Sequence, residues 1–403
     1  MAISLYKVAK FFMLLTGVWK IPVSQQRSLQ KLYFTYSISV QVAYVSYNIS
    51  MILRLFQMWG HYPMSELYTF ITLTILILEI NYKIMIFLKN GIPHMFKVVI
   101  EREQQVLNSG DKHMVSIYLS RVKYYKIATF CQCSCSGFGI LWFVILNLYV
   151  KYAKGVNEHF MYELWFPFNK EKHDLIVTIY NVVIAFYGFL FNCASQTPLQ
   201  TLMVFSTTHL RILQLNVRRC FSFNGKRSED ETTLRRLILE HKFLIRFVKD
   251  LNEAIKNTIF LEWALESLHG AGALLQIISV ESIIEIPYSL MYLCLLVINL
   301  GALAWSANEV IVESQNVANA VYESNWMDQR EQIKRDLLFM LMRAQKPLSI
   351  DVGRFRYMDT DAALTVCKSM WCFLNYNAKL IWEVDHVILC WKFYMQYWPK
   401  VDE

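Results

Sequence analysis

The chain has 403 residues, of which 55% are hydrophobic, 15% are aromatic and only 18% are charged. A soluble chain of this length would carry about 25% charged residues and would divide into about two or three domains joined by polar linkers. With 13 Gly and 8 Pro, the composition also excludes collagen-like and Pro/Gly-rich disordered proteins. Two classes of protein remain: one with a single large apolar core, and one that crosses a membrane several times.

Seven apolar segments are long enough to cross a bilayer, which takes about 20 helical residues each. In chain order they are residues 33–56, 64–88, 124–150, 175–205, 255–280, 286–307 and 355–378, and the last is the least hydrophobic. A weakly apolar span usually turns a polar face to a neighbour or to water. The sequence therefore predicts an all-α membrane protein with seven transmembrane helices in the lipid bilayer.

Lysine and arginine predict how these helices are oriented. Of the 40 basic residues, 31 lie in the arm before the first segment and in the loops 83–126, 206–257 and 308–356. Because basic loops stay on the cytoplasmic side, we expect a cytoplasmic N-terminus and an extracellular C-terminus, the reverse of a G-protein-coupled receptor. The positive charge alternates between segments instead of forming one stripe, so no nucleic-acid partner is expected.

The cytoplasmic connections are patterned as helices. Residues 234–251 and 325–345 place apolar side chains at helical spacing with charges between them. We expect residues 1–32 to form a cytoplasmic arm and residues 33–308 to form a six-helix region whose extensions, 206–257, project into the cytosol. Residues 309–354 would form a further cytosolic helical region.

Ionisable side chains interrupt the fifth segment. Glu262, Glu266 and His269 share one helical stripe. Each costs about 2.5–3.5 kcal/mol at membrane depth, which makes these residues functional candidates. The favoured interpretation is a polar stripe that faces the bundle or the cytosolic vestibule, and a role in permeation or gating is the alternative. Glu266 and His269 match a di-iron motif, but the second copy, at Glu383, lies on the other side of the membrane, so no metal is expected. Nucleotide-binding and hydrolase motifs are absent from the sequence, so we expect no cofactor and no enzymatic activity.

Five short motifs have specific composition and spacing. They are Gly301–Ser306, Ala320–Trp326, Leu338–Leu348 with its Met-Arg-Ala-Gln-Lys-Pro-Leu core, Gly353–Phe355, and Leu164-Trp-Phe-Pro-Phe168 before the fourth segment. This set resembles the insect odorant receptor family over essentially the whole chain. The resemblance implies an odorant-gated, non-selective cation channel that forms a heterotetramer with a co-receptor subunit. It also implies the plasma membrane of olfactory sensory neuron dendrites as its location.

Two other functions stay open as alternatives. One is a gustatory-type ligand-gated channel that works without a co-receptor. The other is a polytopic enzyme or transporter, which would show clustered catalytic residues or paired broken helices, and the sequence has neither.

The family's pocket location, together with helical spacing, selects candidate contacts for a small volatile odorant. They lie in the outer halves of the second, third, fourth and sixth segments, although ordinary helix packing is the alternative for any one of them. An apolar pocket with a few hydroxyl groups is what such a ligand needs. The candidates are Tyr68, Ile71, Thr72, Ile75, Ser136, Gly139, Phe143, Asn147, Tyr180, Ile184, Tyr187, Tyr288, Tyr292 and Leu295.

The resemblance also implies roles for the last third of the chain. Residues 309–354 would be the anchor that joins subunits, with Trp326, Leu337, Leu341 and Met342 at the subunit interface. Residues 355–378 would line the pore, residues 379–403 would form an extracellular tail, and the gate would consist of Leu374, Tyr376 and Asn377.

Overall fold

The computed structural model describes residues 4–22, 26–61, 64–153, 162, 164–170, 172–221, 227–279 and 286–377. Within these ranges the chain forms helices and one short antiparallel hairpin. The elements are α1 (Lys7–Leu15), α2 (Arg27–Met58), α3 (Met64–Lys89), α4 (Ile92–Leu107), α5 (Lys112–Ala153), α6 (Asp174–Arg218), α7 (Arg227–Ser279), α8 (Ile286–Tyr322), α9 (Glu331–Ala344), β1 (Asp351–Val352), β2 (Arg356–Tyr357) and α10 (Thr360–Asn377). The predicted all-α fold is confirmed.

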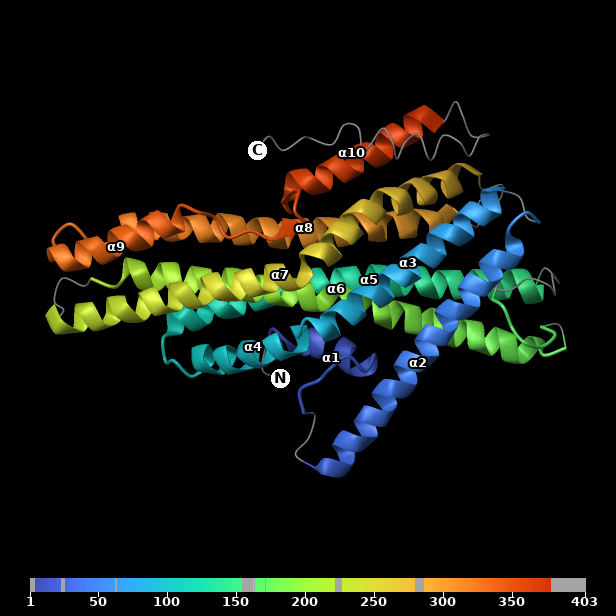
Figure 1. Cartoon of the computed structure of the whole chain (residues 1–403), viewed down its shortest axis with the longest axis horizontal. Coiled ribbons are helices and arrows are strands. Elements are labelled where there is room, and N and C mark those ends of the chain that lie inside the picture. The colour runs from blue at the N-terminus through green and yellow to red at the C-terminus, as the bar shows by residue number, and fades with distance from the viewer. Residues whose placement is uncertain are drawn as a thin grey trace.

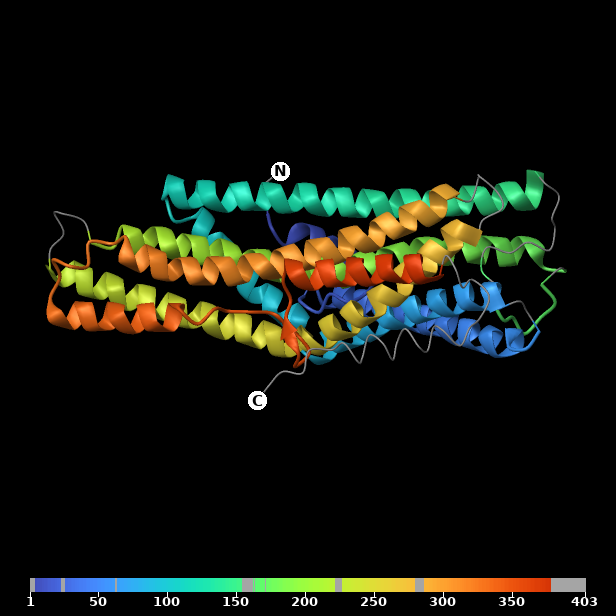
Figure 2. The same cartoon turned by 90° about the horizontal axis from the view of Figure 1, so that it is seen from above.

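The long helices run along one axis as an elongated bundle, with α2 crossing it obliquely (Figure 1). At one end α7, α8 and α9 lie side by side in both views, beyond the half of the bundle that contains α2, α3 and α10 (Figures 1 and 2). The predicted segments from the first to the sixth fall within α2, α3, α5, α6, α7 and α8, apart from residue 280, which lies outside the described residues. The predicted cytosolic extensions are therefore helical continuations of membrane-spanning helices.

The helix of the seventh segment begins at Thr360, later than the predicted start at residue 355. A tight hairpin occupies the intervening residues, with Asp351 paired to Tyr357 and Val352 to Arg356. Its turn contains Gly353 at φ +64°, a left-handed conformation that glycine adopts without steric cost. Asn252 on α7 holds the hairpin through two hydrogen bonds of 2.7 and 2.8 Å to Asp351. The predicted seventh segment is therefore shortened at its start by the hairpin.

Helix α6 forms the centre of the bundle. It packs against α1, α3, α4, α5, α7 and α8, and nearly every side chain from Cys193 to Leu215 is buried, whichever way it points. Such a helix is expected to be apolar, yet Thr197 and Thr201 lie on it. Their hydroxyl groups donate to the carbonyl oxygens four residues earlier, over 2.8 and 2.7 Å, so their burial leaves no donor unpaired.

Four helices in the described part of the chain are long and apolar enough to cross a membrane, namely those over Phe70–Lys89, Lys112–Tyr152, Asp174–Arg218 and Ser289–Tyr322. The described surface also carries rows of large apolar side chains. On α2 a row at helical spacing is exposed, consisting of Ile38, Val42, Val45, Ile49, Leu53 and Phe56. Such a row is unfavourable in water and ordinary against lipid chains.

Candidate functional site

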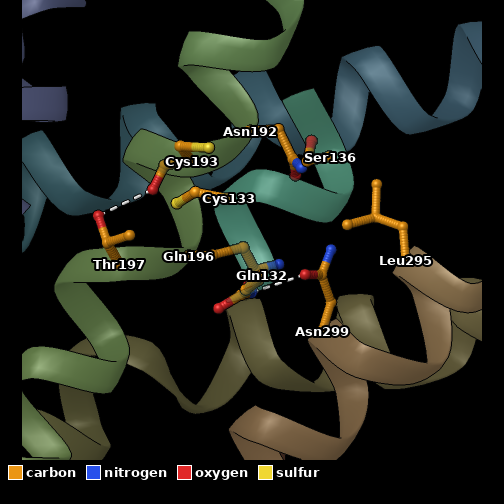
Figure 3. Close-up of a pocket in the computed structure, with 9 residues that line it drawn as sticks. All are labelled: Gln132, Cys133, Ser136, Asn192, Cys193, Gln196, Thr197, Leu295 and Asn299. Carbon is orange, nitrogen blue, oxygen red and sulfur yellow. Dashed lines mark hydrogen bonds between the residues drawn. The ribbon is translucent and has the colours of Figure 1, made fainter. Parts of the chain in front are cut away.

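A cavity lies between α5, α6 and α8 in the half of the bundle that contains these apolar segments (Figure 3). It holds about 200 Å³ of space not filled by atoms, open solvent included. Its lining is unusually polar for the interior of an apolar bundle, and it consists of Gln132, Cys133, Ser136, Asn192, Cys193, Gln196, Thr197, Leu295 and Asn299. In this conformation the cavity has room for about one water molecule, so a larger ligand that makes one or two hydrogen bonds would enter only as the surrounding side chains move apart.

A ladder of side-chain amides runs along one wall of the cavity. Gln200 Nε2 donates to Gln132 Oε1 over 3.0 Å, and Gln132 Nε2 donates to Asn299 Oδ1 over 2.6 Å. All three residues are at least 95% buried. The ladder ties α6 to α5 and α5 to α8, and it ends with the Asn299 amide nitrogen pointing towards Leu295 and Ser136 (Figure 3).

A second polar connection leaves the cavity through Gln196. Its Nε2 donates to Glu262 Oε1 on α7 over 2.6 Å, and the same oxygen lies 3.1 Å from the Lys83 ammonium group on α3. A carboxylate only accepts hydrogen bonds, so Gln196 has to turn its NH₂ group towards Glu262. The other end of that amide, Gln196 Oε1, is buried and has no hydrogen-bond partner.

Lys83 and Glu262 belong to a buried charged cluster. Lys83 also pairs with Glu79, four residues earlier on α3, over 2.8 Å, while Glu266 and His269 lie on the α7 side. His269 Nδ1 lies 3.9 Å from Glu79 Oε2, which is beyond hydrogen-bond distance. Among the described residues, no group of three or more His, Cys, Asp or Glu side chains is arranged to hold a metal ion. Three carboxyl groups thus share one ammonium group between α3 and α7.

The predicted ligand residues lie on α3, α5, α6 and α8. Ser136 and Leu295 line the cavity, and Gly139 lies beside Met291 of α8. The ring of Phe143 lies 5.4 Å from that of Tyr162, at the end of the bundle beyond the cavity. The half-buried side chains among the rest are Ile71, Ile75, Asn147, Tyr180, Tyr187 and Tyr292, and Thr72 and Ile184 are buried. The side chains of Tyr68 and Tyr288 lie outside the described residues.

Sequence reasoning missed the polar side chains that give the cavity its chemistry. Gln132 and Asn299 are each flanked by apolar residues in a predicted span, and that isolation was a usable signal because buried amides need partners. Gln196 stands between Ser195 and Thr197, so no such signal marks it. Glu79 and Lys83, four residues apart within one apolar segment, were a second signal. The stripe of Glu262, Glu266 and His269 was recognised, but its partner on α3 was not.

The gate residues predicted from the resemblance, Leu374, Tyr376 and Asn377, lie in the last turn of α10, and their side chains are outside the described residues. The anchor residues are described. Leu337 is buried within the chain, and Trp326 and Leu341 are half-buried against the core. Met342 is 56% exposed, beside Leu338 and Phe339 on the same face of α9. The exposed face of α9 is therefore apolar.

Comparison with known proteins defines the class. The model of the 7tm odorant receptor family matches residues 64–370, most of the chain. The chain therefore belongs to the odorant receptor family, a family of membrane-embedded receptors and not of enzymes. It is 30% identical over 185 residues to Odorant receptor 10 of Aedes albopictus and 21% identical over 278 residues to Odorant receptor 59b of Drosophila melanogaster. The matches span 44% and 66% of this chain, and 48% and 66% of these relatives' own lengths.

A solved structure has the same fold. The insect olfactory receptor OR5 from Machilis hrabei, in complex with eugenol, superposes with a TM-score of 0.81 over 93% of this chain and 97% of that one. The same receptor in a second structure gives a TM-score of 0.79. Sequence identity is 17% in the first case, so this likeness establishes the architecture alone.

Proposed function

We propose that this chain is the odorant-binding subunit of a non-selective cation channel that works in a heterotetramer with a co-receptor subunit. The observation that carries the proposal is the small cavity with polar walls, enclosed by three helices of an apolar bundle in a member of the odorant receptor family. Apolar burial supplies affinity for a small volatile molecule, and the few polar groups fix its orientation. The proposed location is the plasma membrane of olfactory sensory neuron dendrites.

The packing of α8 supports coupling between the cavity and the proposed pore helix. Leu295 and Asn299 on α8 line the cavity, and α8 also packs against α10. A ligand opens a channel only if it binds the open state more tightly than the closed state. Because α8 contacts both regions, a ligand that shifts α8 would alter the position of α10.

The remaining site assignments are part of this proposal. The outer residues on α3, α5, α6 and α8 would form the entrance to the cavity, with Phe143 and Tyr292 as aromatic contacts. Leu374, Tyr376 and Asn377 would form a constriction that blocks ions by excluding water. Trp326, Leu341 and Met342 would contribute to the subunit interface.

The proposal is tested by recording odorant-evoked currents from cells that express the chain with and without the co-receptor. We expect cation currents in response to a subset of a broad odorant panel, and only when the co-receptor is present. Currents of equal size without the co-receptor would favour the gustatory-type channel instead. No odorant-evoked current from a receptor that reaches the cell surface with its co-receptor would contradict the proposed function.

A further inference from the structure

The unpartnered oxygen of Gln196 bears on the chemistry of the ligand. Gln196 lines the cavity and is 4% exposed, and its Oε1 has no donor within reach. A buried acceptor without a donor costs free energy, and the other cavity groups do not relieve it. Thr197, the neighbouring hydroxyl, already donates to the Cys193 carbonyl oxygen over 2.8 Å.

The orientation of the Gln196 amide is fixed from outside the cavity. Flipping the amide would place its oxygen against Glu262 Oε1, 2.6 Å away, where two acceptors would repel each other. The ammonium group of Lys83, 3.1 Å from that carboxylate oxygen, favours the negative charge that makes the carboxylate an acceptor. The charged cluster on α3 and α7 therefore makes Gln196 an acceptor, and never a donor, towards the cavity.

The hydrogen bonds of the amide ladder fix Asn299 the other way round from Gln196, with its oxygen paired and its NH₂ group left over. Asn299 uses its oxygen to accept from Gln132 over 2.6 Å, which leaves its NH₂ group as the donor directed towards Leu295 and Ser136 (Figure 3). Two residues of the cavity lining, Gln196 on α6 and Asn299 on α8, thus have amides fixed in opposite senses, one with its oxygen left over and one with its NH₂ group left over. A hydroxyl group matches both, because its hydrogen donates and its oxygen accepts.

We propose that the cavity selects odorants that carry a hydroxyl group, alcohols or phenols, with the ligand O–H donating to Gln196 Oε1 and its oxygen accepting from Asn299 Nδ2. This inference rests on the proposed function and narrows its ligand class. An ether, ketone or ester has no hydrogen to donate, so it would leave Gln196 Oε1 without a donor. A binding site discriminates strongly against a ligand that leaves one of the site's buried polar groups unpaired.

The test compares compounds that share one carbon skeleton and differ in one functional group. A secondary alcohol, its methyl ether and the matching ketone are applied to the receptor co-expressed with its co-receptor, at several chain lengths. We expect the alcohol to be about ten- to a hundred-fold more potent than the ether and the ketone at the chain length that acts best. An ether or ketone that equals the alcohol would overturn the inference while leaving the proposed function intact.

Two variants examine the cause of the preference. Gln196→Met keeps the side-chain length and removes the acceptor, so the alcohol should lose its advantage over the ether. Glu262→Gln provides an amide that can donate to a flipped Gln196, so the ketone should gain potency relative to the alcohol. Gln214→Met is the matched control on the same helix, because Gln214 is a buried amide that donates to a glutamate, Glu313, and does not line the cavity. An alcohol preference that survives Gln196→Met at the cell surface, or that disappears equally in Gln214→Met, would overturn the assignment to Gln196.

Discussion

Lys83 on α3 and Glu262 on α7 form an ion pair of 3.1 Å in which both side chains are at least 97% buried. These residues are 179 positions apart in the chain. Lys83 also forms an ion pair with Glu79, and Glu262 also accepts a hydrogen bond from Gln196. The pair therefore connects α3, α7 and the central helix α6 at one point. It also sets the polarity of a cavity that neither residue lines.

Removing the ammonium group should destabilise the protein strongly. Lys83→Met leaves Glu79 and Glu262 buried without a cation, and breaking one partner of a buried pair costs about 3–5 kcal/mol. We expect a large drop in the thermal unfolding temperature of the detergent-solubilised protein. Lys89→Met is the control, since Lys89 lies exposed in the last turn of the same helix. Equal unfolding temperatures for the two variants would contradict the structural role of Lys83.

A histidine in the part of α7 that we predict to be cytosolic should make stability depend on pH. Burial, with Arg343 of α9 nearby, lowers the pKa of His241 to about 4. The unfolded value is about 6.5, so between these two values the unfolded chain binds more protons than the folded one and stability falls as pH falls. The full effect is about 3 kcal/mol, and the stability is present above pH ~6.5. Unfolding temperatures of the wild type and His241→Gln should therefore diverge between pH 7 and pH 4, and parallel curves would show that His241 does not contribute.

The exposed face of α9 should be needed for assembly. Phe339 and Met342 are 69% and 56% exposed, whereas Leu337 on the same helix is buried within the chain. Phe339→Asp with Met342→Asp should abolish co-purification with the co-receptor and leave the unfolding temperature of the isolated chain unchanged. Leu337→Asp, by contrast, should lower the unfolding temperature of the isolated chain. Intact complexes from the double variant would remove this face from the interface.

Contact between α7 and α10 should influence channel opening. A Cβ atom at Gly270 would overlap the Met370 side chain, the last buried side chain described on the proposed pore helix. Gly270→Val should therefore push the Met370 side chain aside and, through this contact with α10, change the resting current or the odorant potency. Gly188→Val is the matched control, because a Cβ at Gly188 on α6 would meet no atom within 4 Å. Identical currents from both variants and the wild type would contradict a role for this contact.

Sequence reasoning predicted the helices well because apolar length and basic loops report directly on membrane spans. Ser136 and Leu295, which the resemblance to the family and helical spacing selected, line the cavity, and their contact with a ligand stays a prediction. Sequence reasoning did not find Gln132, Gln196 or Asn299, because their partners come from other helices and periodicity within one helix says nothing about contacts between helices. The hairpin before α10 was also missed, since a two-residue strand leaves no periodic pattern.

The central claim is that a small ligand acts in the cavity between α5, α6 and α8, and one pair of variants tests it most directly. Ser136 lines the cavity and is 4% exposed, whereas Ser134, on the same helix, is exposed on the outer surface. Odorant dose responses should be recorded for Ser136→Leu and Ser134→Leu with the co-receptor present and surface expression measured. We predict that Ser136→Leu, which fills the cavity, loses at least about ten-fold in potency and that Ser134→Leu keeps wild-type potency. Wild-type potency in a Ser136→Leu receptor that reaches the membrane would contradict the claim.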